Sequence, residues 1–136
     1  MSGPIFVDSN VLLDVFGLDP VWGQWSTARI VELGSRARLI INPIVYAEVS
    51  VRFDDKSALD CAVAGFDRED IPYEAAFLAG KVYVEYRRRG GVQTSLLPDF
   101  LICAHAAVRR YPLLTRDARR YANVFSSLRL IGPPRS

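Results

Sequence analysis

Short apolar segments alternate with longer amphipathic segments along almost the whole chain. The short segments predict buried strands at residues 5–7, 38–42, 113–114 and 128–131, with a further strand expected near Asp70 and Ile71. Because a helix between two strands returns the chain to the same end of a sheet, this alternation predicts an α/β layer fold with a mainly parallel sheet. The carboxyl ends of such strands share one edge, where ligands bind in folds of this class.

Capping and breaking residues mark the expected helices. Helix starts are predicted at Val11, Asp19-Pro20, Asn42-Pro43, Asp54 or Asp55, and Pro98, and helix ends at Gly17 and Gly90-Gly91. The two last long helices each have one apolar stripe for the core: Ala75, Leu78, Ala79, Val82, Tyr83 and Tyr86 in the first, and Phe100, Ala104, Ala107, Val108 and Tyr111 in the second.

The length of 136 residues fits a single domain over residues 1–136. Half of the residues are hydrophobic and 24% are charged, which is enough apolar surface for a core. The net charge of +2 is compatible with a nucleic-acid partner but does not require one. Cys61 and Cys103 are expected to be buried and reduced. No apolar run reaches the roughly 20 residues that cross a bilayer, so we expect no membrane association and a cytoplasmic location.

Four acidic residues adjoin the predicted strand ends. Asp8 follows the first strand, Asp117 follows the strand at 113–114, and Asp99 lies in the first turn of a helix. Glu48 lies inside the helix after the second strand, among apolar residues where a solvated acid is less expected. Taken singly, Asp8 also suits a helix cap and Asp99 a charge at a helix N-terminus. Taken together, all four are placed to converge at one edge of the sheet.

Converging carboxylates repel one another unless a proton or a cation offsets their charge. Mg²⁺ or Mn²⁺ is the expected partner, because these hard ions prefer oxygen ligands. A zinc or iron site would use histidine and cysteine, and the chain has one histidine and two cysteines. The sequence therefore predicts a site where a divalent cation acts on a phosphate ester.

The four acids lie in four strings, which are IFVDSNVLLDVF, INPIVYAEVSVRF, LLPDFLICAHA and LLTRDARRY. In order and spacing these strings resemble the four acidic motifs of PIN-domain ribonucleases, especially VapC-type toxins of bacterial toxin–antitoxin pairs. The resemblance extends from Ile5 to Pro133. One such motif would be weak, whereas four in the correct order are specific.

The resemblance implies a PIN-like fold, with a central parallel sheet of four or five strands flanked by helices. It also implies Mg²⁺ or Mn²⁺ dependence, endonucleolytic cleavage of RNA, a cognate antitoxin and a homodimer. Its catalytic and metal-binding acids fall on Asp8, Glu48, Asp99 and Asp117, and its polar neighbours of the metal fall on Asn10 and Thr115. Many relatives have a further acid where Arg119 and Arg120 stand here, which leaves open whether one or two ions bind.

Several other residues have both a functional and a structural interpretation. Arg116, Arg119 and Arg120 are candidate RNA contacts, because the guanidinium group suits phosphate. His105 is six residues after Asp99, which turns it away from that acid on a helix, so we expect a partly exposed position without a catalytic role. The structural interpretation is also preferred for two further groups, the helix-terminal cations Arg87, Arg88 and Arg89 and the packing residues Trp22 and Trp25.

Two rival functions remain. A receiver or phosphotransfer domain also has an acidic Mg²⁺ pocket, but it needs a late lysine, and Lys56 and Lys81 lie in mid-chain. The other rival is a non-catalytic PIN-like module that binds RNA or an antitoxin.

Phe77, Gly80 and Val84 form a second apolar line on the long helix, and this extra apolar surface predicts contacts with protein partners.

Overall fold

A computed structural model, which describes residues 3–90 and 97–134, has five short strands in one parallel sheet. The strands are β1 (Ile5–Val7), β2 (Leu39–Ile41), β3 (Asp67–Arg68), β4 (Leu113–Leu114) and β5 (Leu130–Ile131). Their spatial order is β3-β2-β1-β4-β5, so β1 is central and pairs with both β2 and β4. The predicted α/β class and parallel sheet are confirmed. The third strand was misplaced, since it lies a few residues before Asp70.

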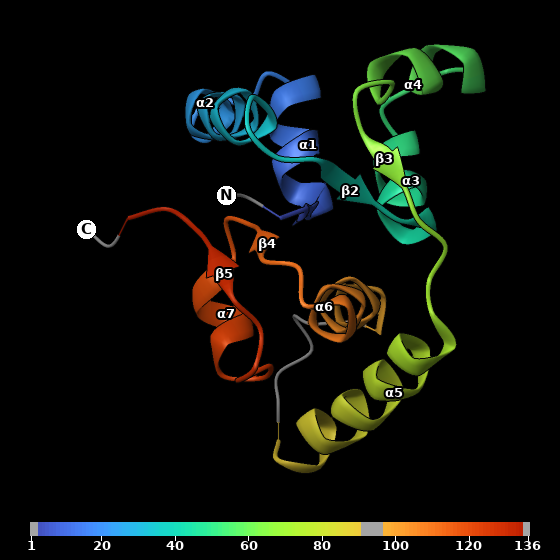
Figure 1. Cartoon of the computed structure of the whole chain (residues 1–136), viewed down its shortest axis with the longest axis vertical. Helices are drawn as coiled ribbons and strands as arrows, with labels where there is room; N and C mark the ends of the chain where they lie inside the picture. Colours follow the sequence, from blue (N-terminus) through green and yellow to red (C-terminus); the bar gives the residue numbers. More distant parts are fainter. Residues whose placement is uncertain (1–2, 91–96, 135–136) are drawn as a thin grey trace.

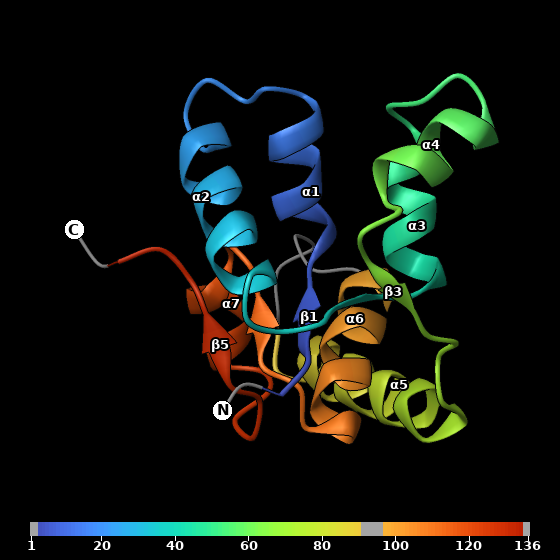
Figure 2. The same cartoon turned by 45° about the horizontal axis from the view of Figure 1, so that its top comes forward.

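Seven helices connect these strands within the described residues. They are α1 (Ser9–Phe16), α2 (Gly23–Gly34), α3 (Pro43–Ser50), α4 (Lys56–Ala62), α5 (Tyr73–Arg88), α6 (Leu97–Arg109) and α7 (Ala118–Ala122). Helices α1 and α2 lie on one side of the sheet, and α5, α6 and α7 lie on the other (Figures 1 and 2). No helix in the described part of the chain is both long and apolar enough to span a membrane.

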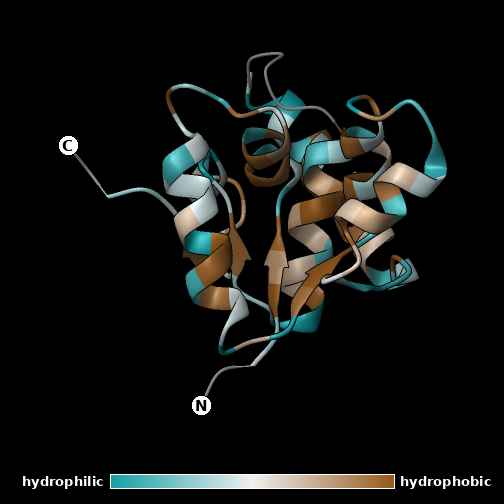
Figure 3. Cartoon of the chain, turned by 90° about the horizontal axis from the view of Figure 1, so that it is seen from above, coloured by the Kyte–Doolittle hydropathy of each residue, from teal (hydrophilic) through white to brown (hydrophobic). Residues whose placement is uncertain are grey.

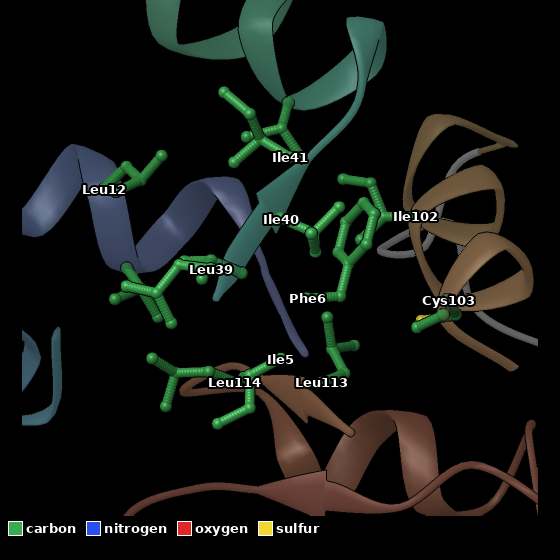
Figure 4. Close-up of a cluster of buried hydrophobic side chains, with 14 of the residues drawn as sticks. Ile5, Phe6, Leu12, Leu39, Ile40, Ile41, Ile102, Cys103, Leu113 and Leu114 are labelled. Atoms are coloured by element: carbon green, nitrogen blue, oxygen red, sulfur yellow. The ribbon is translucent and has the colours of Figure 1, made fainter. Parts of the chain in front are cut away.

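The core forms on both faces of the central strands, because side chains alternate along a strand. Phe6 and its register partner Ile40 lie against Ile102 of α6, whereas Leu39 points toward Leu12 of α1 (Figure 4). Phe6, Ile40 and Ile102 are completely buried. Strands β1, β2 and β4 are hydrophobic, whereas the edge strand β3 consists of two exposed charged residues, and the outer surfaces of the helices carry hydrophilic residues (Figure 3).

Helix α6 is covered on two sides. One side faces the sheet, and the other packs against α5. There the ring of Phe100 makes edge contacts with the rings of Tyr83 and Tyr86, with 5.9 Å and 5.4 Å between the ring centres. Two predictions of side-chain burial were wrong. His105 is completely buried instead of partly exposed, and Cys61 is exposed instead of buried. Cys103 is buried, as predicted.

The helix starts follow the predicted caps with small shifts. The side-chain oxygen of Asn42 accepts hydrogen bonds from the backbone of Ile44 and Val45, and Asp55 caps α4. Helix α1 begins directly after Asp8, without the expected loop. Asp19 organises a turn, and α2 begins later, at Gly23. Helix α6 starts one residue before Pro98, and β2 and β5 are shorter than predicted. The end of α5 is followed by Gly90, which has a positive φ of 78°. Gly91 lies outside the described residues.

Candidate functional site

The first candidate acid, Asp8, lies directly after the central strand β1. Its backbone N–H donates to the carbonyl of Leu114, which continues the pairing of β1 with β4 beyond the last strand residue. Only 2% of Asp8 is exposed to solvent. The sheet itself therefore places this carboxylate, and neighbouring groups rather than water set its electrostatics.

The pKa of Asp8 is raised to about 7, far above that of an exposed aspartate. Burial is the main cause, and the charges of Asp99 and Asp117 raise the pKa further. The hydroxyl of Thr115 opposes these effects by donating a 2.8 Å hydrogen bond to the Asp8 carboxylate. Asp8 is thus a carboxylate whose negative charge lacks compensation, which is the electrostatic setting that a bound cation would relieve.

Asn10 and Thr115 join Asp8 to Asp117. The amide nitrogen of Asn10 lies 3.3 Å from an Asp8 oxygen and 3.1 Å from an Asp117 oxygen. The Thr115 hydroxyl accepts a hydrogen bond from the backbone N–H of Asp117 while donating to Asp8. Both predicted polar neighbours therefore lie among the acids, although their role toward a metal remains a prediction.

Glu48 reaches the same region from α3. The hydroxyl of Ser9 donates to Glu48 at 2.6 Å and lies 3.5 Å from Asp8, so it links the first two acids. Burial raises the pKa of Glu48, and the charge of Asp99 adds to the increase, while Ser9 lowers it. Glu48 and Asp8 are therefore both electrostatically coupled to Asp99. Ser9 was missed from the sequence, where its position beside Asp8 is the only signal.

Arg120 lies between the remaining two acids. One terminal nitrogen of its guanidinium is 3.0 Å from Asp117, and the other is 3.9 Å from Asp99. The side chain comes from α7, three residues after Asp117, and is 29% exposed. The site thus has an internal positive charge as well as four acids.

The sequence prediction took Arg116 as a candidate RNA contact, and its guanidinium has an internal partner. It forms two parallel hydrogen bonds to Asp14, at 2.8 and 2.9 Å, and Asp14 is 98% buried. The hydroxyl of Ser26 donates to the same carboxylate, and the guanidinium also lies over the Trp22 ring. Asp14 was missed as a partner, since a single acid in the apolar helix α1 gives no sign of what it will meet. By contrast, Arg119 is exposed.

His105 belongs to a separate buried network. Its Nδ1 lies 3.0 Å from the amide nitrogen of Asn42, whose oxygen is already used to cap α3, so Nδ1 accepts and Nε2 donates to Glu69. The hydroxyl of Tyr111 also donates to Glu69. Burial lowers the pKa of His105, which favours the neutral ring. This network ties α6 to the chain segments that follow β2 and β3, and it gives His105 a structural explanation.

A divalent cation fits the chemistry of the four acids but not their present arrangement. Carboxylate and hydroxyl oxygens are the donors that Mg²⁺ and Mn²⁺ prefer, and burial together with neighbouring negative charge raises the pKa values of Asp8 and Glu48. Among the described residues, however, no three acidic, histidine or cysteine side chains are grouped to hold one metal ion. Part of the compensating charge comes from Arg120 instead.

The sequence model of the PIN domain matches residues 5–125. The chain belongs to the PIN-domain family. This PIN domain also resembles solved structures at low sequence identity. A chain of VapBC2 from Rickettsia felis bound to a DNA fragment from the promoter gives a TM-score of 0.74 at 17% identity, covering 96% of this chain and 99% of that one. A toxin–antitoxin complex from Klebsiella pneumoniae gives 0.72 at 20% identity, covering 97% and 99%.

VapBC-1 from nontypeable Haemophilus influenzae gives a TM-score of 0.72 at 16% identity, covering 95% of this PIN domain and 97% of that chain. A comparison with curated proteins gives no match. The family membership predicted from the four motifs is therefore confirmed, and the structural likeness confirms the fold.

Proposed function

We propose that this PIN domain is a metal-dependent endoribonuclease and the toxin of a VapC-type toxin–antitoxin pair. The observation that carries the proposal is the burial of Asp8 beside Asp99 and Asp117, because such a set of charges calls for a cation. PIN domains of VapC toxins are generally nucleases, which supports the same reaction class.

Asp8, Glu48, Asp99 and Asp117 would hold Mg²⁺ or Mn²⁺ in this proposal. When bound, such an ion activates water for attack on an RNA phosphodiester and stabilises the leaving oxygen. The residues of the chain keep the acids in position: Thr115 and Asn10 hydrogen-bond to Asp8, and Ser9 to Glu48. Arg119 and, when released from Asp117, Arg120 are candidate contacts for RNA phosphate. Arg116 is also a candidate contact for RNA phosphate, and it would stay paired with Asp14 while making that contact.

The test is cleavage of a mixed RNA pool by the purified chain with Mn²⁺, with and without EDTA. Asp8→Asn and Asp99→Asn should each lower the rate by about a hundredfold or more, because the metal loses an anionic ligand. Asp54→Asn is the matched control, since Asp54 is exposed and remote from the sheet edge. Equal cleavage by wild type and both site variants would exclude the proposal.

A cognate antitoxin and a cytoplasmic location belong to the same proposal. The similar structures from Rickettsia felis and Klebsiella pneumoniae are described as VapBC2 and as a toxin–antitoxin complex, which supports a partner protein here. The antitoxin should dock over the acidic edge, where an arginine or lysine would neutralise carboxylates and displace metal. Inhibition should then weaken as Mn²⁺ concentration increases.

A homodimer is the second proposed assembly, with α5 as its contact surface. Tyr73 is 93% exposed, Phe77 69% and Val84 50%, on the side of the helix that does not face α6. Exposed apolar side chains on one helix face are typical of protein interfaces.

The alternative function is a non-catalytic module that binds RNA or an antitoxin. The pairing of Arg120 with Asp117 favours it, because an acid that is paired with an arginine is a weaker metal ligand. Tight antitoxin binding together with no cleavage and no Mn²⁺ binding would select this alternative.

A further inference from the structure

Arg120 is the positive charge that the site already contains. Its guanidinium contacts two of the four acids, which come from different elements: Asp99 from α6 and Asp117 from the turn before α7. The guanidinium hydrogen-bonds to Asp117 at 3.0 Å, and its charge also acts on Asp99 and Asp8.

Two further contacts hold the guanidinium in this place. The nitrogen that lies near Asp117 is also 3.0 Å from the hydroxyl of Tyr121, and the guanidinium carbon lies 4.8 Å from the centre of the Tyr121 ring. Tyr121 is 1% exposed and therefore fixed in the core. Arg120 is thus anchored by a rigid aromatic side chain and does not sample solvent as a surface arginine would.

We propose that Arg120 is an internal counter-cation that competes with the divalent metal for Asp99 and Asp117, and this inference rests on the proposed metal-dependent function. The guanidinium hydrogen-bonds to one of the two carboxylate oxygens of Asp117, and its charge repels a second cation nearby. Arginine does not lose its proton in proteins, so the competition is not relieved by a change of pH.

The competition has a spatial consequence. An ion that binds through Asp8 and Glu48 should compete less with Arg120 than an ion that binds through Asp117, because the guanidinium lies 3.0 Å from the Asp117 carboxylate. The wild-type chain should therefore bind one Mn²⁺ more readily than two. Removing the guanidinium should strengthen Mn²⁺ binding or expose a second site.

The test is Mn²⁺ binding, measured by isothermal titration calorimetry and by electron paramagnetic resonance of the free ion at fixed ionic strength. Arg120→Gln should bind Mn²⁺ about tenfold more tightly than wild type, or bind a second ion, because a nearby positive charge is lost. Arg120→Lys keeps the charge and should stay close to wild type. Arg119→Gln is the matched control, because it removes the neighbouring, exposed positive charge.

Equal Mn²⁺ affinity and stoichiometry in wild type and a folded Arg120→Gln variant would overturn the inference, as would equal tightening by Arg119→Gln. These results would leave the proposed function intact, since the wild type still binds metal. Absence of Mn²⁺ binding in all variants would overturn the proposed function as well.

A second measurement uses the wild-type chain and does not depend on any variant folding. In a ¹⁵N-labelled sample titrated with Mg²⁺, the Nε–Hε signal of Arg120 should move together with the backbone signals of Asp99 and Asp117. A signal from Arg120 that stays fixed while the two acids respond would overturn the inference.

Discussion

The hydroxyl of Thr115 donates a 2.8 Å hydrogen bond to the carboxylate of Asp8, although the two residues are 107 positions apart in the sequence. This bond joins the residues that follow β4 and β1, and it favours the charged form of a buried acid. Thr115→Val should therefore raise the pKa of Asp8 further and lower Mn²⁺ affinity. Folding stability should fall by about 1–2 kcal/mol, because Asn10 and the Asp117 backbone also lose a partner.

Thr27→Val is the control for this prediction, since Thr27 is exposed on α2. Isothermal titration calorimetry measures the Mn²⁺ affinity, and urea denaturation measures the folding stability. If Thr115→Val and Thr27→Val have the same Mn²⁺ affinity, the hydrogen bond does not support a metal ligand.

The raised pKa of Asp8 predicts how metal-free stability changes with pH. The native carboxyl titrates near pH 7 and the unfolded one near 3.8, so the native state binds more protons between these values. Stability from this residue is present below about pH 4 and is lost as pH rises to about 7. Asp8→Asn should consequently be more stable than wild type at pH 8 in EDTA, and the gap should close toward pH 4.

Urea denaturation of both proteins across this pH range measures the effect, with Asp54→Asn as control. Adding Mg²⁺ at pH 8 should stabilise wild type by mass action and have less effect on Asp8→Asn. A pH-independent difference between the two proteins would rule out the raised pKa of Asp8.

The buried histidine network predicts the opposite pH dependence. Burial lowers the pKa of His105 in the native state, so its contribution is present above the unfolded value near 6.5 and is lost as pH falls through the native value. His105→Leu should reduce stability by about 2–4 kcal/mol at pH 7.5, because Asn42 and Glu69 lose a buried partner. The difference from wild type should shrink at pH 5.

Tyr111→Phe is the milder companion variant, because it removes only the hydroxyl that reaches Glu69. This variant should lower the free energy of unfolding by about 1 kcal/mol. A His105→Leu protein as stable as wild type at both pH values would argue against a structural role for the ring.

The pair formed by Arg116 and Asp14 predicts unequal effects of its two single substitutions. Arg116→Ala leaves a buried carboxylate with Ser26 as its remaining hydrogen-bond donor, and should destabilise the chain by about 2–4 kcal/mol. Asp14→Asn should cost less, since the Arg116 side chain can reach solvent. Thermal unfolding of both variants and the double variant gives the coupling energy. Additive effects would mean that the two residues act independently.

The exposed face of α5 is tested by Phe77→Asp. This change should shift a dimer toward monomer while leaving each chain folded, because Phe77 is 69% exposed within one chain. Val31→Asp on α2 is the control, since Val31 is similarly exposed at 67% but lies across the sheet from α5. Size-exclusion chromatography with light scattering measures the mass. A monomeric wild type at high concentration would remove the prediction.

The sequence predicts the acidic edge well because its geometry follows from strand direction. Parallel strands end on the same side, so Asp8 and Asp117 must come close once β1 and β4 are neighbours. Asn10 and Thr115 were found through their motifs. The positions of these four residues depend on the backbone more than on side-chain packing.

What the sequence does not predict is which second surface covers a residue. A single apolar stripe predicts one buried face on α6, but α5 and the sheet bury two, which is why His105 was assigned a partly exposed position. The same difficulty applies to Asp14, Arg116 and Arg120, whose partners come from other elements. A long charged side chain can reach several neighbours, and local periodicity does not predict which of them it contacts.

Asp8 is buried directly after the central strand of the sheet, and its carboxylate is there at a cost to folding. Replacing its carboxylate with a neutral group would abolish the proposed activity and make the metal-free chain sturdier at neutral pH. The proposed activity therefore favours a carboxylate at position 8, whereas the stability of the metal-free chain favours a neutral group. Inactivating changes at Asp8 should therefore leave a well-folded protein, which would still bind the proposed antitoxin.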